Sequence, residues 1–142
     1  MTPTRELTEQ VSKSLVEFSK YKSLRIVSIY GGVSLGPQIE SLRRADIAVG
    51  TPGRILDHLA RRTMDLSKVR FLVLDEADRM LDMGFFHDVI KIVETCPKNR
   101  QTFLFSATIS SDIREISKRY MNNPTEVSVE SYVDPTKLEH VF

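Results

Sequence analysis

The chain has 142 residues, enough for one domain, and its 41% hydrophobic and 27% charged residues are typical of a globular protein with a real core. A net charge of +1 excludes bulk basic charge as a source of nucleic-acid affinity, so such a surface would need a few placed groups. No apolar run approaches the ~20 residues of a membrane span, and no secretory signal opens the sequence. A lone Cys96 excludes an intrachain disulfide or thiolate metal site, and the three histidines lack metal-ligand spacing. Because one unpaired cysteine suits a reducing compartment, we expect a cytoplasmic protein without a membrane partner.

Helix and strand patterns alternate along the chain. In order, they predict a helix over 5–20, a strand over 24–30, a helix from 36, a strand over 46–50, a helix from 52, a strand over 70–75, a helix over 86–96, a strand over 101–106, a helix after 111 and a strand over 126–130. The first helix should bury a stripe of Leu7, Val11, Leu15 and Phe18. The strands at 70–75 and 101–106 are nearly all apolar, which predicts burial on both faces.

This alternation predicts an α/β fold, with a mostly parallel sheet, helices on both faces and right-handed crossovers. In such folds ligands bind outside the carboxyl ends of the strands. The segments that follow the strands are therefore the expected functional edge.

Three carboxylates follow the strand over 70–75, in the stretch VLDEADRML. Asp75 could hold Mg²⁺ through water, because Mg²⁺ keeps much of its hydration shell. Glu76 could orient or deprotonate an attacking water, as phosphoryl transfer requires. The alternative is an acidic helix start that is favoured only by the helix dipole.

The run Ser106-Ala107-Thr108 follows the strand over 101–106, so its hydroxyls should lie on the same edge as Asp78. Hydroxyls beside a carboxylate predict a hydrogen-bonded link between the two loops. Capping of the helix near Ser110 is the alternative role, and both could hold.

Two helix starts carry threonine and arginine in a phosphate-binding pattern, at TPGR (51–54) and TPTRE (2–6). Backbone N–H groups, a hydroxyl and a guanidinium together suit a phosphate. Either alone is more often simple capping. With the Gly31-Gly32 turn beside them, they indicate a surface that follows a phosphate backbone.

Together these motifs resemble the DEAD-box ATP-dependent RNA helicase family. PTREL (3–7), GG (31–32), TPGR (51–54), DEAD (75–78) and SAT (106–108) occur in that family's order. The resemblance implies a three-layer αβα RecA-like fold of the P-loop NTPase type, lacking the strand that leads to the phosphate loop. It also implies that residues 1–135 form a partial first domain, and that 136–142 begin the interdomain linker.

The same resemblance implies a role for each matching residue. ATP and Mg²⁺ would be the cofactors, with Asp75 and Glu76 as nucleotide-binding and catalytic residues and Asp75 holding Mg²⁺ through water. Asp78 would bond to Ser106 and Thr108, coupling the nucleotide state to strand separation. The RNA sugar-phosphate backbone would be contacted by Thr4, Arg5, Gly32, Thr51, Gly53 and Arg54, without sequence readout.

Two parts of that family's machinery have no counterpart in the 142 residues. No G-x-x-x-x-G-K-[ST] run is present, since Gly31 and Gly36 are followed by Pro37-Gln38. Nor do these 142 residues include a second RecA-like domain. We therefore expect this chain alone to bind ATP weakly and not to hydrolyse it. We also expect a marginal fold that repacks, swaps or dimerises, because interior strands of the sheet are missing.

Two other interpretations stay open. One is a non-catalytic RNA-binding remnant that keeps PTREL, GG and TPGR. The other is an α/β-hydrolase, because GVSLG (32–36) matches a nucleophile elbow with Ser34 as nucleophile and Asp75 and His87 or His140 downstream. Pro37 argues against it, since it predicts a helix that begins three residues after Ser34.

Overall fold

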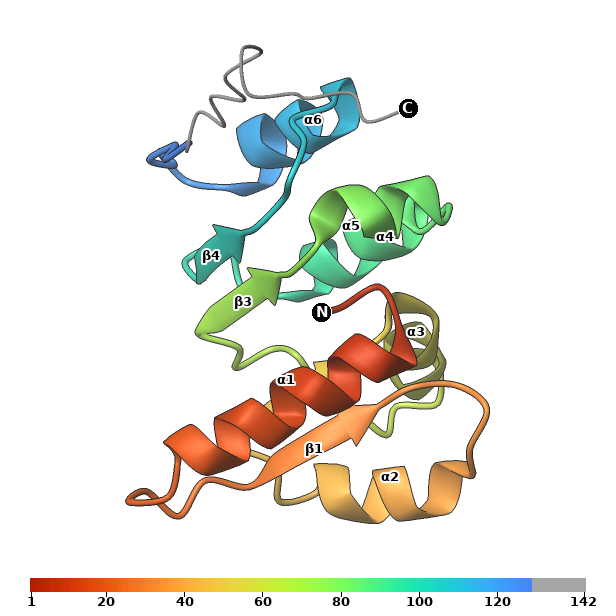
Figure 1. Ribbon diagram of the computed structural model, residues 1–142. Helices are drawn as coiled ribbons and strands as arrows, with labels where there is room; N and C mark the ends of the chain where they lie inside the picture. The colour runs from red at the N-terminus through yellow and green to blue at the C-terminus, as the bar shows by residue number, and fades with distance from the viewer. Residues whose placement is uncertain (129–142) are drawn as a thin grey trace, which may run out of the picture.

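A computed structural model describes residues 1–128 of the chain (Figure 1). Helices and strands alternate as predicted, which confirms the α/β class. In chain order the elements are α1 (Arg5–Phe18), β1 (Ile26–Ile29), α2 (Leu35–Leu42), β2 (Ile47–Gly50), α3 (Pro52–Ala60), β3 (Phe71–Leu74), α4 (Ala77–Asp82), α5 (Phe86–Thr95), β4 (Gln101–Leu104) and α6 (Ser111–Tyr120). None of the described helices is long and apolar enough to cross a membrane.

The four described strands form two parallel pairs. β1 pairs with β2, with Ile26 opposite Ile47, and β3 pairs with β4, with Phe71 opposite Gln101. Both pairings are parallel, as predicted, and the break between the two pairs over residues 1–128 agrees with the expectation that interior strands of the sheet are missing. No described strand lies between β2 and β3, so their facing edges share no ladder.

The first two residues bridge these pairs at the carboxyl ends of the strands. The backbone N–H of Thr2 donates to the carbonyl of Gly50 (3.0 Å), and the N–H of Asp75 donates to the carbonyl of Met1 (3.0 Å). The nitrogen of Met1 also donates to the carbonyl of Val73. This junction places the start of α1 beside the end of β3, on the edge where function is expected.

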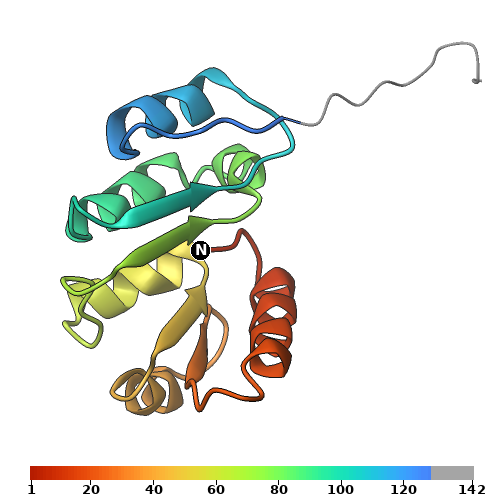
Figure 2. The same cartoon turned by 90° about the vertical axis from the view of Figure 1, so that its left-hand side faces the viewer.

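Helices cover both sides of the strands (Figure 2). α1 packs on β1 and β2 from one side, whereas α3 and α5 pack against each other on the opposite side. The buried core joins both strand pairs to α5 and α6, and its largest fully buried side chains include Ile29, Leu74, Met80, Ile92 and Ile116. One core therefore supports the whole carboxyl edge.

The fully buried positions of α1 are polar, whereas Leu7, Val11 and Leu15 of the predicted apolar stripe are only half-buried. Its buried residues are Thr8 and Ser12, whereas Phe18 is exposed. The hydroxyl of Thr8 lies 2.6 Å from that of Thr2, and Ser28 of β1 donates to Ser12 (2.8 Å). Small hydroxyl residues allow α1 to approach β1 closely while each buried polar group finds a partner.

Over residues 1–128 one face of β3 and β4 is uncovered, so the prediction that both strands are buried on both faces is wrong for this part of the chain. Alternate residues of β3 are buried, but Phe71 is 61% exposed and Val73 40% exposed. On the neighbouring chain segment Phe103 and Phe105 are also exposed. α1 packs mainly on β1 and β2, not on β3 and β4.

β1 and β2 approach each other most closely at Gly50. A Cβ atom on this residue would lie 2.5 Å from the carbonyl oxygen of Ile29 and 2.9 Å from its Cβ. Only glycine fits there, and the N–H of the next residue, Thr51, donates to the same carbonyl (2.9 Å). The tight pairing fixes where the TPGR turn leaves the sheet.

Several element bounds differ from the prediction. The helix α4 was not predicted, and α2 begins at Leu35 rather than at Pro37. No strand is present over 126–128, and the rest of the strand predicted over 126–130 lies outside the described residues. The expected domain boundary at 135 and the linker over 136–142 also lie outside them.

Candidate functional site

The turn that follows β3 holds the first two acids in a constrained backbone conformation. Glu76 has φ 48° and ψ 52°, which lies in the left-handed region that residues other than glycine seldom occupy. Its N–H donates to Oδ1 of Asp75 (3.1 Å). The turn is held from both sides, because Ala77 donates to the carbonyl of Phe105 (2.9 Å) and Phe105 donates to that of Leu74 (2.8 Å). Such conformations cluster at functional sites, since the surrounding structure must enforce them.

Arg79 fixes the side chain of Glu76. Its Nη1 lies 3.1 Å from Oε2 of Glu76, one turn earlier on α4, and both side chains are about half exposed. An exposed pair of this kind stabilises the fold little. Its effect here is to orient a carboxylate that remains accessible to solvent at the carboxyl edge.

Asp78 links the loop after β3 to the loop after β4. Its Oδ2 accepts hydrogen bonds from the backbone N–H (2.9 Å) and the hydroxyl (3.0 Å) of Thr108. Desolvation raises the pKa of Asp78, but hydrogen bonds from Thr108, Arg79 and Ala107 outweigh it, so the pKa lies below its usual range. The two loops are therefore joined through an ionised carboxylate.

Ser106 takes part in this link indirectly. The expected direct bond to Asp78 is absent among the described hydrogen bonds; instead the Ser106 hydroxyl donates to the carbonyl of Thr108 (2.7 Å). The bond closes the turn that presents Thr108. Capping of α6 belongs to Ser110, whose hydroxyl accepts from the N–H of Ile113 (3.3 Å).

These acids and hydroxyls line an open hollow of about 380 Å³. Its lining residues are Glu76, Asp78, Arg79, Asp82, Ser106 and Ala107. No cluster of three metal-ligating side chains occurs over residues 1–128. Carboxylates suit Mg²⁺, but an ion here would need most of its ligands from water and from a nucleotide, which is how Mg²⁺ is commonly held in nucleotide-hydrolysing sites. Asp75 is not among the lining residues; it lies at the start of the turn that leads into the hollow, where its Oδ1 accepts the N–H of Glu76.

Thr4 and Arg5 lie at the start of α1, beside the junction with β3. The hydroxyl of Thr4 accepts from the N–H of Leu7 (3.2 Å), which confirms Thr4 as an N-cap. Arg5 forms an ion pair with Glu9 (3.2 Å), and its guanidinium carbon lies 4.8 Å above the ring centre of Tyr30. Arg5 is half exposed, so it remains accessible to a ligand.

The turns after β1 and β2 contact each other through Arg54. Both terminal nitrogens of Arg54 donate to the carbonyl of Val33 (3.0 and 3.1 Å), and its side chain is only 12% exposed. Gly32, at φ 80°, makes the turn that brings this carbonyl into reach. The guanidinium expected to face RNA is therefore turned inward, where it holds the Gly31-Gly32 turn against α3.

Thr51 and Gly53 keep groups available for a ligand at the start of α3. Thr51 is the N-cap and Pro52 the first helical residue, as predicted, but the Thr51 side chain makes no capping hydrogen bond. A Cβ on Gly53 would meet nothing within 4 Å. The hydroxyl, the first N–H groups of α3 and the open space over Gly53 together fit a phosphate group.

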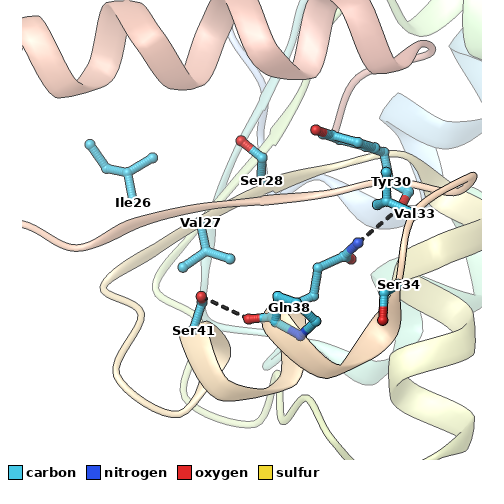
Figure 3. Close-up of a pocket in the computed structure, with 9 residues that line it drawn as sticks. Ile26, Val27, Ser28, Tyr30, Val33, Ser34, Gln38 and Ser41 are labelled. Carbon is cyan, nitrogen blue, oxygen red and sulfur yellow. Dashed lines mark hydrogen bonds between the residues drawn. The ribbon is translucent and has the colours of Figure 1, made fainter.

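A buried polar chain behind this surface was not predicted from the sequence. In Figure 3, Gln38 points from α2 toward the end of β1, beside a hollow of about 510 Å³ between these elements. Its Nε2 donates to the carbonyl of Tyr30 (3.2 Å), and its Oε1 lies 3.2 Å from Nε2 of His58. The other ring nitrogen of His58 lies 2.8 Å from the Thr63 hydroxyl, and burial lowers the pKa of His58. His58 lies between Ile55 and Leu59 at the helical spacing of α3. This spacing is the sequence signal that could have predicted that His58 is buried.

The structure places a helix start directly after Ser34, as the hydrolase interpretation requires, but no catalytic partner beside it in residues 1–128. α2 begins immediately after Ser34, so the argument from Pro37 is wrong. Ser34, however, has φ −58° and ψ 140°, without the strain of a nucleophile elbow. Among the hydrogen bonds of residues 1–128, none joins the Ser34 hydroxyl to His87 or to Asp75, and the ring of His87 packs edge-on against Phe86. His140 lies outside the described residues.

Comparisons with known proteins support the arrangement described above. The chain is 52% identical over 131 residues to the ATP-dependent RNA helicase DeaD of Haemophilus influenzae, covering 91% of this chain and 21% of that protein. It resembles the crystal structure of a DEAD box protein from Methanococcus jannaschii with a TM-score of 0.85 and 49% identity, covering 87% of this chain and 34% of that one. The yeast DEAD-box splicing factor Prp28 gives a TM-score of 0.80 at 38% identity, with coverages of 84% and 29%.

The chain thus spans between about a fifth and about a third of the length of these relatives. The family model described as DEAD/DEAH box helicase matches residues 1–116, which include every motif from PTREL to SAT. With this match over more than half of its length, the chain belongs to the DEAD/DEAH box helicase family.

Proposed function

We propose that this chain is part of an ATP-dependent RNA helicase that remodels short RNA duplexes and acts in the cytoplasm. The observation that carries the proposal is the link from Asp78 to Thr108, beside the strained turn at Asp75 and Glu76. This link joins the acidic turn after β3, which would serve the nucleotide, to the loop after β4 at the same edge of the sheet. A second RecA-like domain would complete the site from outside this chain.

In this proposal Asp75 supports Mg²⁺ through water and Glu76 orients the attacking water. Bound Mg²⁺ and ATP would supply the phosphoryl group and neutralise its developing charge. The chain contributes the position of the carboxylates: Asp75 is held by the N–H of Glu76, and Glu76 by Arg79. Both acids would act on groups presented by other parts of a complete helicase.

The RNA surface in this proposal contacts the sugar-phosphate backbone and is insensitive to base sequence. Thr4, Arg5, Thr51 and Gly53 would contact the RNA directly, together with the exposed turn at Gly32. Arg54 would act indirectly, because its guanidinium holds that turn in place. Binding of this type weakens as salt rises, since phosphate contacts release counterions.

The test measures binding of a fluorescein-labelled single-stranded RNA by anisotropy at several salt concentrations. We expect salt-dependent binding, with similar affinity for unrelated sequences. Arg5→Ala should weaken binding and reduce the salt slope by about 1, whereas Arg43→Ala, which removes an exposed arginine of α2, should not. Equal effects of the two substitutions would contradict the assignment of Arg5.

We also propose that the 142-residue chain by itself does not hydrolyse ATP, because its sequence has no G-x-x-x-x-G-K-[ST] run to bind the phosphates. RNA-stimulated phosphate release by the pure chain would contradict this. If the chain binds RNA equally with and without ATP and Mg²⁺, the second candidate function, a non-catalytic RNA-binding module, describes it better.

A second copy of the chain is the partner we propose for the open face of β3 and β4. The exposed side chains of Phe71, Val73, Phe103 and Phe105 support this, since contiguous exposed apolar groups favour association. Light scattering coupled to gel filtration should give a mass near twice 16.2 kDa, and Phe71→Lys should reduce it to the monomer. A wild-type monomer at high concentration would refute self-association.

A further inference from the structure

Arg5 belongs to a cluster of three side chains, in which Arg5 and Glu9 of α1 are exposed and Tyr30, directly after β1, is half-buried. The hydroxyl of Tyr30, at the end of β1, donates to Oε1 of Glu9 (2.7 Å), and Nε of Arg5 donates to the same oxygen (3.2 Å). The guanidinium carbon lies 4.8 Å above the Tyr30 ring centre. The hydrogen bond from Tyr30 lowers the pKa of Glu9, so its carboxylate stays charged. These contacts hold one face and the Nε edge of the guanidinium.

The contacts with Glu9 and Tyr30 leave the terminal nitrogens of the Arg5 guanidinium available for a ligand. Over residues 1–128, the hydrogen bonds of Arg5 use only Nε, so Nη1 and Nη2 keep their donors. Two adjacent terminal nitrogens form the fork that binds two phosphate oxygens. Arg54 is the contrasting case, because both of its terminal nitrogens are used inside the protein. Arg5 is therefore the arginine of this surface that is both oriented and accessible.

Long side chains lose rotamer freedom when they bind, and a side chain already held in place loses less. We infer that Tyr30 is a positioning residue for RNA binding, which holds the guanidinium of Arg5 with its terminal nitrogens toward a backbone phosphate while Glu9 anchors both. The inference rests on the proposed RNA-binding function. It assigns to Tyr30 no contact with the RNA itself.

The test is a double-mutant cycle on RNA affinity in the full 142-residue chain. A cation–π contact at an exposed site contributes about 0.5–1 kcal/mol, so Tyr30→Leu should weaken binding about two- to fivefold. Tyr30→Phe keeps the ring and should retain most of the affinity. In an Arg5→Gln background, Tyr30→Leu should have no further effect, because Tyr30 acts through Arg5.

Two controls separate positioning from loss of structure. Tyr21→Leu removes a 92% exposed tyrosine outside the cluster and should leave affinity unchanged. The Nε–H signal of Arg5 in ¹⁵N NMR spectra should show restricted motion in the wild-type chain and in Tyr30→Phe, and increased motion in Tyr30→Leu, with the backbone amide spectrum preserved.

The possible outcomes separate this inference from the function on which it rests. Additive effects of Tyr30→Leu and Arg5→Gln would mean that the ring contacts RNA or supports the fold, and would overturn the inference alone. An unchanged Arg5 Nε–H signal in Tyr30→Leu would also overturn it. A wild-type chain that binds no RNA at low salt would overturn both.

Discussion

The left-handed backbone at Glu76 predicts an unusual order of stability between two substitutions at this position. Outside the left-handed region, alanine is normally preferred over glycine because it restricts the unfolded chain. At φ 48° and ψ 52° the order should reverse, so that Glu76→Gly is more stable than Glu76→Ala. Both variants lose the ion pair with Arg79, so that loss cancels in the comparison.

The expected difference follows from two opposing contributions. A Cβ atom in the left-handed region costs about 1–2 kcal/mol, which glycine avoids. The glycine variant in turn loses about 0.4–1 kcal/mol of stability, because its unfolded chain has greater conformational freedom. The difference between these ranges is centred at about 0.8 kcal/mol in favour of glycine, which corresponds to a Tm higher by about 3 °C for a domain of this size.

Thermal unfolding followed by circular dichroism measures this difference. Gly53→Ala is the matched control, because residue 53 lies in α3 with ordinary φ and open space around the added Cβ. There alanine should stabilise the protein, by up to about 1 kcal/mol. If Glu76→Ala were as stable as Glu76→Gly while the control behaved as expected, the strained turn at Glu76 would be refuted.

Three further predictions concern the close approach of β1 and β2, the Arg25–Asp46 ion pair and the bond between Asp78 and Thr108. Gly50→Ala should destabilise the chain by about 1–3 kcal/mol, because its Cβ would meet backbone atoms of β1; an unchanged urea midpoint would contradict the close approach. Asp46 accepts two bonds from the Arg25 guanidinium, which lowers the pKa of this carboxyl to about 2. The free energy of unfolding of the wild type should therefore exceed that of Asp46→Asn by its full amount above about pH 4, and the difference should vanish as the pH falls toward 2. Urea denaturation at each pH measures it, and a difference that does not change with pH would contradict the prediction. Thr108→Val should raise the pKa of Asp78, because one of its donors is lost; a carboxyl ¹³C titration identical to that of wild type would show that the hydroxyl bond does not matter.

Local patterns predicted the elements that local interactions stabilise. The N-caps Thr4 and Ser110 begin helices α1 and α6, because a hydroxyl that accepts a backbone N–H acts within one turn. The strand that precedes Asp75 and the strand that precedes Ser106 pair in parallel, so both loops share one edge. The meeting of Asp78 with Thr108 follows from this parallel pairing.

Patterns failed where the partner of a side chain lies far away in the chain. An apolar run cannot show which of its faces is covered, so Phe71 and Val73 were expected in the core and are exposed. Arginine in a helix start suits a phosphate, but Arg54 bonds to a carbonyl 21 residues earlier. The stripe expected on α1 is wrong at Phe18, which is exposed, whereas Ser12 is buried with its hydroxyl bonded to that of Ser28, 16 residues later in the chain.

Periodicity, caps and spelled-out motifs were enough to predict the alternation of helices and strands apart from α4, the edge on which the acids and hydroxyls lie, and the family. The tertiary structure alone decided which polar groups meet: Glu76 with Arg79, Ser106 with Thr108, and Arg5 with Tyr30. The reason is physical, because a side-chain hydrogen bond or cation–π contact depends on ångström-scale placement of two segments. That placement follows from the packing of the whole core.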